Sequence, residues 1–234
     1  MTRASDLATL LTTGGTIPTV TASTAVKTPL VEFTDGDDAL TITDGGNVNV
    51  NGTLQQGSSA VKVAGKETIY VPAAAMYPNT TNGCASLAQV ELSNGPEVKV
   101  LDFDASSDEN AQFTVAFPDS WNEGTVTFQA FFTVTGTNTG TVAWGLSGVA
   151  VADNDSCNTA FGTNVVATAK AHSGTSNDIN VTAESGAVTI AGSPSTSEFV
   201  FFQIMRDVSA DDQSGDARLL GVQLFFTTDA ANDA

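Results

Sequence analysis

Positively charged residues are scarce in this chain. Its 234 residues include 26 Asp and Glu but only 8 Lys and Arg, and the formal net charge is -18 at pH 7 with the single histidine, His172, neutral. Proteins bind nucleic acids largely through clustered Lys and Arg, whereas the basic residues of this chain are scattered along its length. The composition therefore argues against nucleic acid and anionic membranes as partners.

Long apolar runs and clusters of cysteine are also missing. No segment approaches the roughly 18 apolar residues that cross a bilayer, and the first residues, Met-Thr-Arg-Ala-Ser-Asp-Leu, lack the apolar core of a signal peptide. We therefore expect a protein made in the cytoplasm, with no membrane insertion. Cys84 and Cys157 are too few for a disulfide framework and have no partners at zinc-site spacing. They are predicted to be ordinary buried thiols, and the sequence leaves open whether they pair.

Aromatic residues are nearly absent from the first part of the chain. Phe33 is the only aromatic among the first 66 residues, although the whole chain has 13 Phe, 2 Trp and 2 Tyr. Each buried aromatic side chain contributes roughly 150–250 Å² of buried surface, so this part has little with which to build a core. The distribution predicts three regions: an N-terminal anchor or arm over residues 1–34, a short β stalk over residues 35–66 and a β-sandwich over residues 67–234.

The anchor region begins with a short amphipathic pattern. Ser5 and Asp6 can cap a helix, and Leu7, Leu10 and Leu11 follow at i, i+3 and i+4 spacing. A helix shorter than about 12 residues is marginal in water by itself. We therefore expect these leucines to dock on another subunit or a larger body and to anchor the protein there; a frayed terminus is the alternative.

The stalk region shows the two-residue period of short strands. Leu40 and Ile42 alternate with threonines, and Val48 and Val50 alternate with asparagines, with Gly at the turns between them. The resulting apolar face is too thin for an independently stable hairpin. Three copies wound about an axis would bury it, which predicts a homotrimeric stalk; a hairpin packed on its own C-terminal domain is the alternative.

Longer strands with larger side chains begin after residue 66. Val126, Phe128, Ala130, Phe132 and Val134 alternate with a polar face that only Phe131 interrupts, as in a half-buried antiparallel strand. Further strands are predicted near residues 97–103, 111–117, 140–151, 163–170, 178–183, 187–191 and 198–206. A last strand is expected over 218–228, with Leu220, Val222, Leu224 and Phe226 inward. Short strands with Gly, Asn, Asp and Pro turns predict an all-β fold, an antiparallel β-sandwich or jelly roll.

Two tryptophans and two arginines stand out in this region. Trp121 lies at a turn and Trp144 in a strand, where we expect both rings to be core anchors. Arg206 and Arg218 stand close to acidic residues such as Asp207 and Asp216. In so acidic a chain, pairing with carboxylates is their expected role.

Motifs for catalysis are missing. There is no Gly-x-Ser-x-Gly elbow and no phosphate-binding loop, and His172 lies in a segment with loop composition. Acidic clusters occur at residues 35–38, 102–109, 153–155 and 211–216. They could act as a glycosidase pair or bind Ca²⁺, but none has the EF-hand pattern. Solvated turns are the expected role, so we predict no enzyme, no catalytic residues and no cofactor, with Ca²⁺ as the alternative.

Several segments resemble a domain found in tail-fibre-like and other virion structural proteins of tailed bacteriophages. They are Glu67-Thr-Ile-Tyr-Val-Pro-Ala-Ala-Ala-Met-Tyr-Pro, Leu101-Asp-Phe-Asp, Ser120-Trp-Asn-Glu-Gly-Thr-Val-Thr-Phe, Val142-Ala-Trp-Gly-Leu, and Arg206-Asp-Val followed by Asp216-Ala-Arg-Leu-Leu-Gly-Val. Together they span roughly residues 66–228. The resemblance implies a trimeric virion protein with a jelly-roll-like module, on a tail fibre, a head fibre or the capsid surface.

The sequence is compatible with three functions. The first is a trimeric fibre or spike on the virion surface, anchored to other head or tail proteins, that attaches the particle to the host, with loops such as 154–159 and 172–177 contacting surface glycan. The second is a capsid decoration or cement protein that stabilises the head. The third is a free carbohydrate-binding or glycan-degrading domain, against which most aromatics are expected to face inward.

Overall fold

The computed structural model describes residues 30–32, 38–42, 48–50, 53–56, 58–61 and 64–233. The chain divides into two units, residues 1–61 and 62–234, so the boundary falls slightly before the one expected at residue 66. Leu7, Leu10 and Leu11, the expected anchoring residues, lie outside the described residues. None of the helices in the described ranges is long and apolar enough to cross a membrane.

The described part of the N-terminal unit consists of short strands. Strands β1 (Leu30–Glu32), β2 (Asp38–Ile42) and β3 (Val48–Val50) form a three-stranded antiparallel sheet, and β4 (Gln55–Gln56) pairs with β5 (Ser59–Ala60). The register pairs Leu40 with Val50 and Ile42 with Val48, which are the four residues assigned to the apolar face of the expected stalk. Strand β1 lies in the region expected to be an anchor and was not predicted. Trimer formation stays a prediction.

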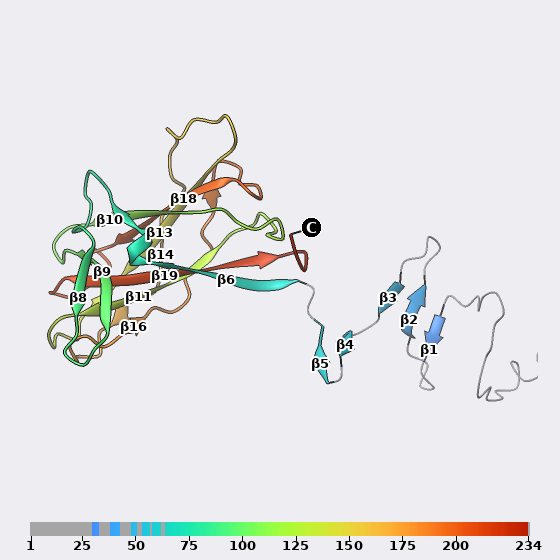
Figure 1. Cartoon of the computed structure of the whole chain (residues 1–234), viewed down its shortest axis with the longest axis horizontal. Coiled ribbons are helices and arrows are strands. Elements are labelled where there is room, and N and C mark those ends of the chain that lie inside the picture. Colours follow the sequence, from blue (N-terminus) through green and yellow to red (C-terminus); the bar gives the residue numbers. More distant parts are fainter. Residues whose placement is uncertain are drawn as a thin grey trace, which may run out of the picture. The chain divides into compact units, whose positions relative to one another are not determined.

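The C-terminal unit is built from two six-stranded sheets (Figure 1). The β13 sheet has the order β14-β13-β18-β10-β7, with β17 beside β13; the β19 sheet has the order β16-β11-β19-β9-β8, with β6 beside β19. Their strands are β6 (Gly65–Pro72), β7 (Tyr77–Pro78), β8 (Ala88–Glu91), β9 (Glu97–Phe103), β10 (Glu109–Val115), β11 (Thr127–Val134), β13 (Trp144–Val151), β14 (Val165–Val166), β16 (Asn180–Val181), β17 (Ile190–Ala191), β18 (Phe199–Arg206) and β19 (Ala217–Thr228). A two-stranded sheet, β12 (Thr141–Val142) with β15 (Lys170–Ala171), and a 3-10 turn, η1 (Ala73–Ala75), complete it.

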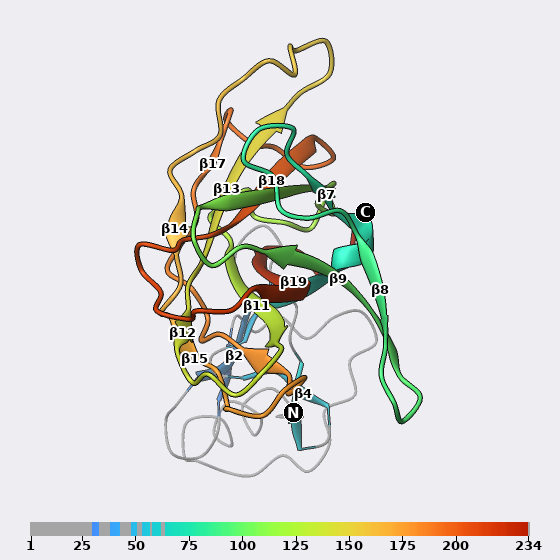
Figure 2. The ribbon, with the colours of Figure 1, turned by 90° about the vertical axis from the view of Figure 1, so that its left-hand side faces the viewer.

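The two sheets form the two layers of a sandwich, the β13 sheet above and the β19 sheet below in Figure 2. Consecutive long strands cross from one layer to the other: β9 and β11 belong to the β19 sheet, whereas β10 and β13 belong to the β13 sheet. The named strand pairs of this unit are antiparallel except β13 with β17. The predicted all-β class, with an antiparallel jelly-roll-like sandwich, is therefore confirmed.

Alternation along the strands explains the core. Val126, Phe128, Ala130, Phe132 and Val134 are fully buried, as their two-residue period predicts. In β19 the prediction was partly wrong, because Leu219 is buried and Leu220 is only half-buried. The register with β11 shifts between Phe131 and Phe132, and such a bulge reverses which residues face inward.

Aromatic rings fill the space between the layers. The ring of Trp121 stacks on Phe117 with centroids 4.3 Å apart, and the ring of Trp144 meets Phe103 edge-on at 4.9 Å. Both tryptophans are at most 1% exposed. The core residues run from Val71 to Phe226, so the sandwich has a hydrophobic core of its own.

The two cysteines differ in their surroundings. Cys84 is buried and Cys157 is exposed, and both are free. The prediction of a buried thiol was wrong for Cys157, which lies in the exposed loop between β13 and β14. Burial raises the pKa of the Cys84 thiol to about 12, with a further contribution from the Glu109 carboxylate.

This difference predicts one reactive thiol per folded chain. Thiolate is the reactive form, and raising the pKa of Cys84 leaves almost none of it at pH 8. Titration with Ellman's reagent at pH 8 is expected to modify one thiol in the native protein and two in denaturant. Two fast-reacting thiols in the native protein would contradict this arrangement.

Candidate functional site

Arg206 lies in the core and has a structural role. Its guanidinium is fully buried and makes two hydrogen bonds to Asp211, at 2.7 and 3.2 Å. It also donates to three backbone carbonyls, those of Phe103, Gln213 and Gly215, at 2.8–3.0 Å. The partner is thus Asp211 and not Asp207 or Asp216, because the chain turns back on itself after β18. Arg218 pairs with Asp102 at 3.2 Å, nearer the surface.

His172, which a Ser-His or Cys-His site would need, is buried between loops. His172 is 3% exposed, with Nδ1 2.8 Å from the Asn138 carbonyl and Nε2 3.1 Å from the Thr175 carbonyl. Both ring nitrogens therefore face backbone carbonyls of neighbouring loops, and the ring is buried between them. Among the described residues, no group of three or more His, Cys, Asp or Glu is placed to hold a metal ion. This gives the Ca²⁺ alternative no geometric support in that part of the chain.

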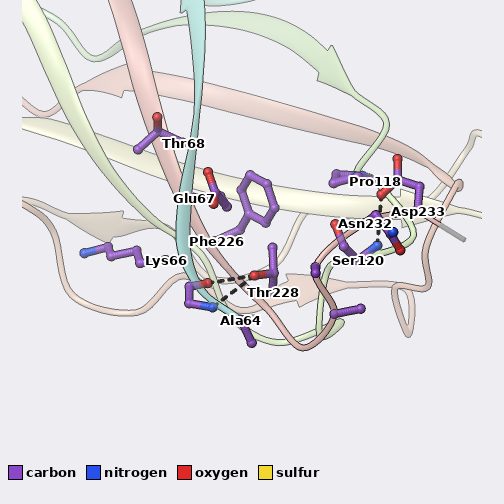
Figure 3. A pocket seen from close by; sticks show the side chains of 13 residues that line it. Ala64, Lys66, Glu67, Thr68, Pro118, Ser120, Phe226, Thr228, Asn232 and Asp233 are labelled. Carbon is purple, nitrogen blue, oxygen red and sulfur yellow. Dashed lines mark hydrogen bonds between the residues drawn. The ribbon is translucent and has the colours of Figure 1, made fainter. Parts of the chain in front are cut away.

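A cavity of about 750 Å³ opens at one end of the sandwich (Figure 3). It is lined by the start of β6, the end of β19 and the residues beyond β19, including Glu67, Phe226 and Asp233. Polar groups around it close the end of the fold: Thr228 Oγ1 accepts from Gly65 N at 3.0 Å and donates to Gly65 O at 3.1 Å, and Ser120 N donates to Asp233 at 3.3 Å. These contacts join the start of β6 to the end of β19, and Ser120 to the residues beyond β19.

The outer surface of the β19 sheet has a different composition. Side chains of β6, β19 and β11 that point away from the core form what we call the ring-and-amide face. Its members are Thr68, Tyr70, Thr127, Gln129, Phe131, Gln223 and Phe225. Their neighbours along the strands, such as Val71, Phe128 and Leu224, are buried, so the face follows from the alternation of strands.

Strand register places these side chains in rows. Gln223 of β19 stands between Tyr70 of β6 and Gln129 of β11, and Phe225 stands between Thr68 and Thr127. Directly paired residues have their Cβ atoms about 4.5–5.5 Å apart. The result is a surface on which aromatic rings alternate with amides and hydroxyls.

The aromatic rings of the face remain open to solvent. Tyr70 is 52% exposed, and Phe131 and Phe225 are half-buried. The Tyr70 and Phe131 rings meet edge-on, with centroids 5.6 Å apart. Burial raises the pKa of the Tyr70 phenol, so the hydroxyl stays protonated and keeps a hydrogen to donate.

A glycine fixes the position of Tyr70. A Cβ atom at Gly221 would lie 2.4 Å from Tyr70 Oη and 2.7 Å from the Val71 carbonyl, so the ring occupies space that any other residue would fill. Tyr70 Oη donates to the Leu220 carbonyl at 3.3 Å. The bulge in β19 lies at this point, so Gly221 and the Leu220 carbonyl determine where the Tyr70 ring, the most exposed ring of the face, is positioned.

An ion pair borders the face. Lys66 pairs with Glu184, and the same carboxylate oxygen accepts a hydrogen bond from Thr127. Lys66 Nζ also lies 4.5 Å from the centre of the Phe225 ring, within the range of a cation–π contact. Hydrogen bonds from Lys66 and Thr127 hold the pKa of Glu184 below its usual range. The pair therefore persists at neutral pH and is lost only as the pH falls below that range.

The face provides stacking surfaces, donors and acceptors, which are the groups that a ligand-binding surface needs. Sequence reasoning singled out Phe131 but missed Tyr70, because β6 and its register with β19 were not predicted. It also passed over Phe225, although the predicted strand over 218–228 with Phe226 inward places Phe225 on the outer side. These two rings are exceptions to the expectation that most aromatics face inward.

The loops predicted to contact a glycan do not come together in the structure. They lie at opposite ends of β13: residues 154–159 come after Val151, whereas the His172 backbone bonds to Gly140, near Trp144. A single ligand-binding site made of both loops is therefore excluded.

Comparison with known proteins gives no family. No family model matches the sequence, and no curated protein matches it. Similar solved structures include the CBM36-1 domain of a multidomain xylanase from the hindgut metagenome of Trinervitermes trinervoides (11% identity, 68% of this chain and 96% of that chain, TM-score 0.36). Others are the family 11 carbohydrate-binding module from Clostridium thermocellum (8%, 74% and 94%, TM-score 0.32) and an arabinose-bound α-L-arabinofuranosidase (14%, 73% and 27%, TM-score 0.40). Similarities with TM-scores this low do not indicate a function for this chain.

Proposed function

We propose that this chain is a surface component of a tailed-phage particle, a fibre or spike that attaches the particle to its host through the β-sandwich. Three copies associate through the N-terminal unit, which fastens them to other virion proteins. The observation that carries the proposal is an exposed face of aromatic rings and amides on a sandwich that has its own core, linked to an N-terminal unit whose described strands are short. The segments that resemble phage virion proteins support the same assignment.

The N-terminal unit supports association of several copies. Its described strands are two to five residues long, and sheets of such short strands bury little apolar surface of their own. Val50, Leu54 and Val61 are 41%, 54% and 40% exposed within the single chain. A neighbouring copy would cover such apolar side chains, and three linked sandwiches would bind a surface more tightly than one.

Attachment is tested with the purified full chain. Labelled protein is expected to bind host cells and, when added in excess, to block adsorption of the phage particle. Failure to bind cells, with particles that lack the protein adsorbing normally, would overturn the proposal. If those particles instead lose infectivity faster on heating, the capsid-stabilising alternative replaces it.

A further inference from the structure

We infer that the ring-and-amide face is a binding site for a neutral glycan chain, with the Lys66–Glu184 pair selecting its hydroxyl groups. This inference rests on the proposed attachment function and names its ligand class and its site. The site lies on the sheet itself, and not on the loops that the sequence suggested.

The rings of the face suit a sugar. The faces of a pyranose ring carry C–H groups with weakly positive hydrogens, which are attracted to the negative face of an aromatic ring. Tyr70 and Phe131 present such rings on β6 and β11, and Phe225 lies on β19 between these strands, with Lys66 over one side of its ring. Because they lie on adjacent strands, a chain of several sugar units that crosses the strands can contact more than one of them.

The polar groups of the face suit hydroxyls. The Gln223 amide has no hydrogen-bond partner among the described residues, so its donors and its acceptor are available to a ligand. The Gln129 amide donates to the Thr182 carbonyl at 2.8 Å, which orients it. At the border, Glu184 accepts and Lys66 donates, a combination that fits two adjacent hydroxyls of one sugar unit.

Charge decides between neutral and anionic glycans. The chain has a net charge of -18, and Lys66, the cation that borders the face, is already paired with Glu184. The negative net charge of the protein would repel an anionic polysaccharide. Among the described residues of this face, Lys66 is the bordering cation, and its charge is already balanced by Glu184. The alternation of rings with amides also differs from the apolar centre of a stable protein–protein interface. A neutral glycan is the ligand that both observations favour.

The face is arranged before any ligand arrives. Gly221 leaves the space in which the Tyr70 ring lies, and the ring is held by Leu220 and Phe131. Gln129 is fixed by Thr182, and Glu184 by Lys66 and Thr127. Binding therefore orders few side chains, which keeps the entropic cost low.

The test uses the full chain on a glycan microarray that carries neutral and anionic glycans, followed by titration of the best neutral binder. The wild type is expected to bind at least one neutral glycan. Tyr70→Ala is expected to weaken that binding about tenfold or more, as loss of a central aromatic contact does. Glu184→Gln is expected to weaken it about tenfold through loss of a charged acceptor, and to increase binding of anionic glycans because Lys66 is no longer neutralised.

The matched control is Tyr77→Ala. Tyr77 is 47% exposed and belongs to β7 of the other sheet, so the same chemical change is made at similar exposure away from the face. It is expected to leave glycan binding unchanged, and Gln223→Ala provides a second test if Tyr70→Ala does not fold. The inference is overturned if no neutral glycan binds, if anionic glycans bind better, or if the Tyr70 and Tyr77 variants lose binding equally. Cell binding that survives Tyr70→Ala would overturn the inference while the attachment function stands.

Discussion

Replacing Arg206 by methionine is expected to lower the free energy of unfolding by about 3–5 kcal/mol, the usual cost of removing one partner of a buried ion pair. The substitution leaves the Asp211 carboxylate, whose side chain is 2% exposed, without its cation. It also removes the donors to the Phe103 carbonyl at the end of β9 and to the Gln213 and Gly215 carbonyls in the loop before β19. Urea denaturation followed by tryptophan fluorescence measures the change.

The same substitution at Arg218 is the control. The Arg218 and Asp102 side chains are 22% and 29% exposed, and solvent-accessible ion pairs contribute about 0–1 kcal/mol. Arg218→Met is therefore expected to change stability by less than about 1 kcal/mol. Equal decreases in the free energy of unfolding for the two variants would contradict the larger contribution expected from the buried Arg206–Asp211 pair.

Removing residues 1–61 is expected to weaken cell binding by a factor of about 10²–10⁴, the range lost when linked binding modules are separated. The remaining sandwich keeps the whole core cluster between Val71 and Phe226, so we expect it to fold and to retain its single-site affinity. Surface plasmon resonance on immobilised glycans extracted from the host cell surface measures the apparent affinity.

A fused trimeric coiled coil provides the control for this deletion. If several copies explain tight binding, joining the sandwich to such a coil is expected to restore it. Tight binding by the monomeric sandwich alone would contradict the role assigned to the N-terminal unit.

Local patterns in the sequence predicted much of the sandwich. Strand β11 followed from the strict alternation of Val126 to Val134, and β9, β18 and β19 were predicted to within a residue of their observed ends. The burial of Trp121 and Trp144 followed the general preference of large rings for the core. In each case the information lies within one strand or one side chain.

Features that depend on contacts distant in the sequence were not predicted. The bulge that turns Leu219 inward depends on the register between β11 and β19. The pairing of Arg206 with Asp211 depends on how the loop folds, and sequence proximity pointed to the wrong acids. The ring-and-amide face depends on β6 lying beside β19, where Tyr70 meets a carbonyl 150 residues away. Phe131 and Phe225, apolar residues on the outward sides of predicted strands, were its signals in the sequence.

The mass of the purified full chain in solution tests the central claim most directly. Sedimentation equilibrium at micromolar concentration is expected to give about 72 kDa, three times the 23.9 kDa of one chain. A single species of 23.9 kDa would contradict a multi-copy attachment protein.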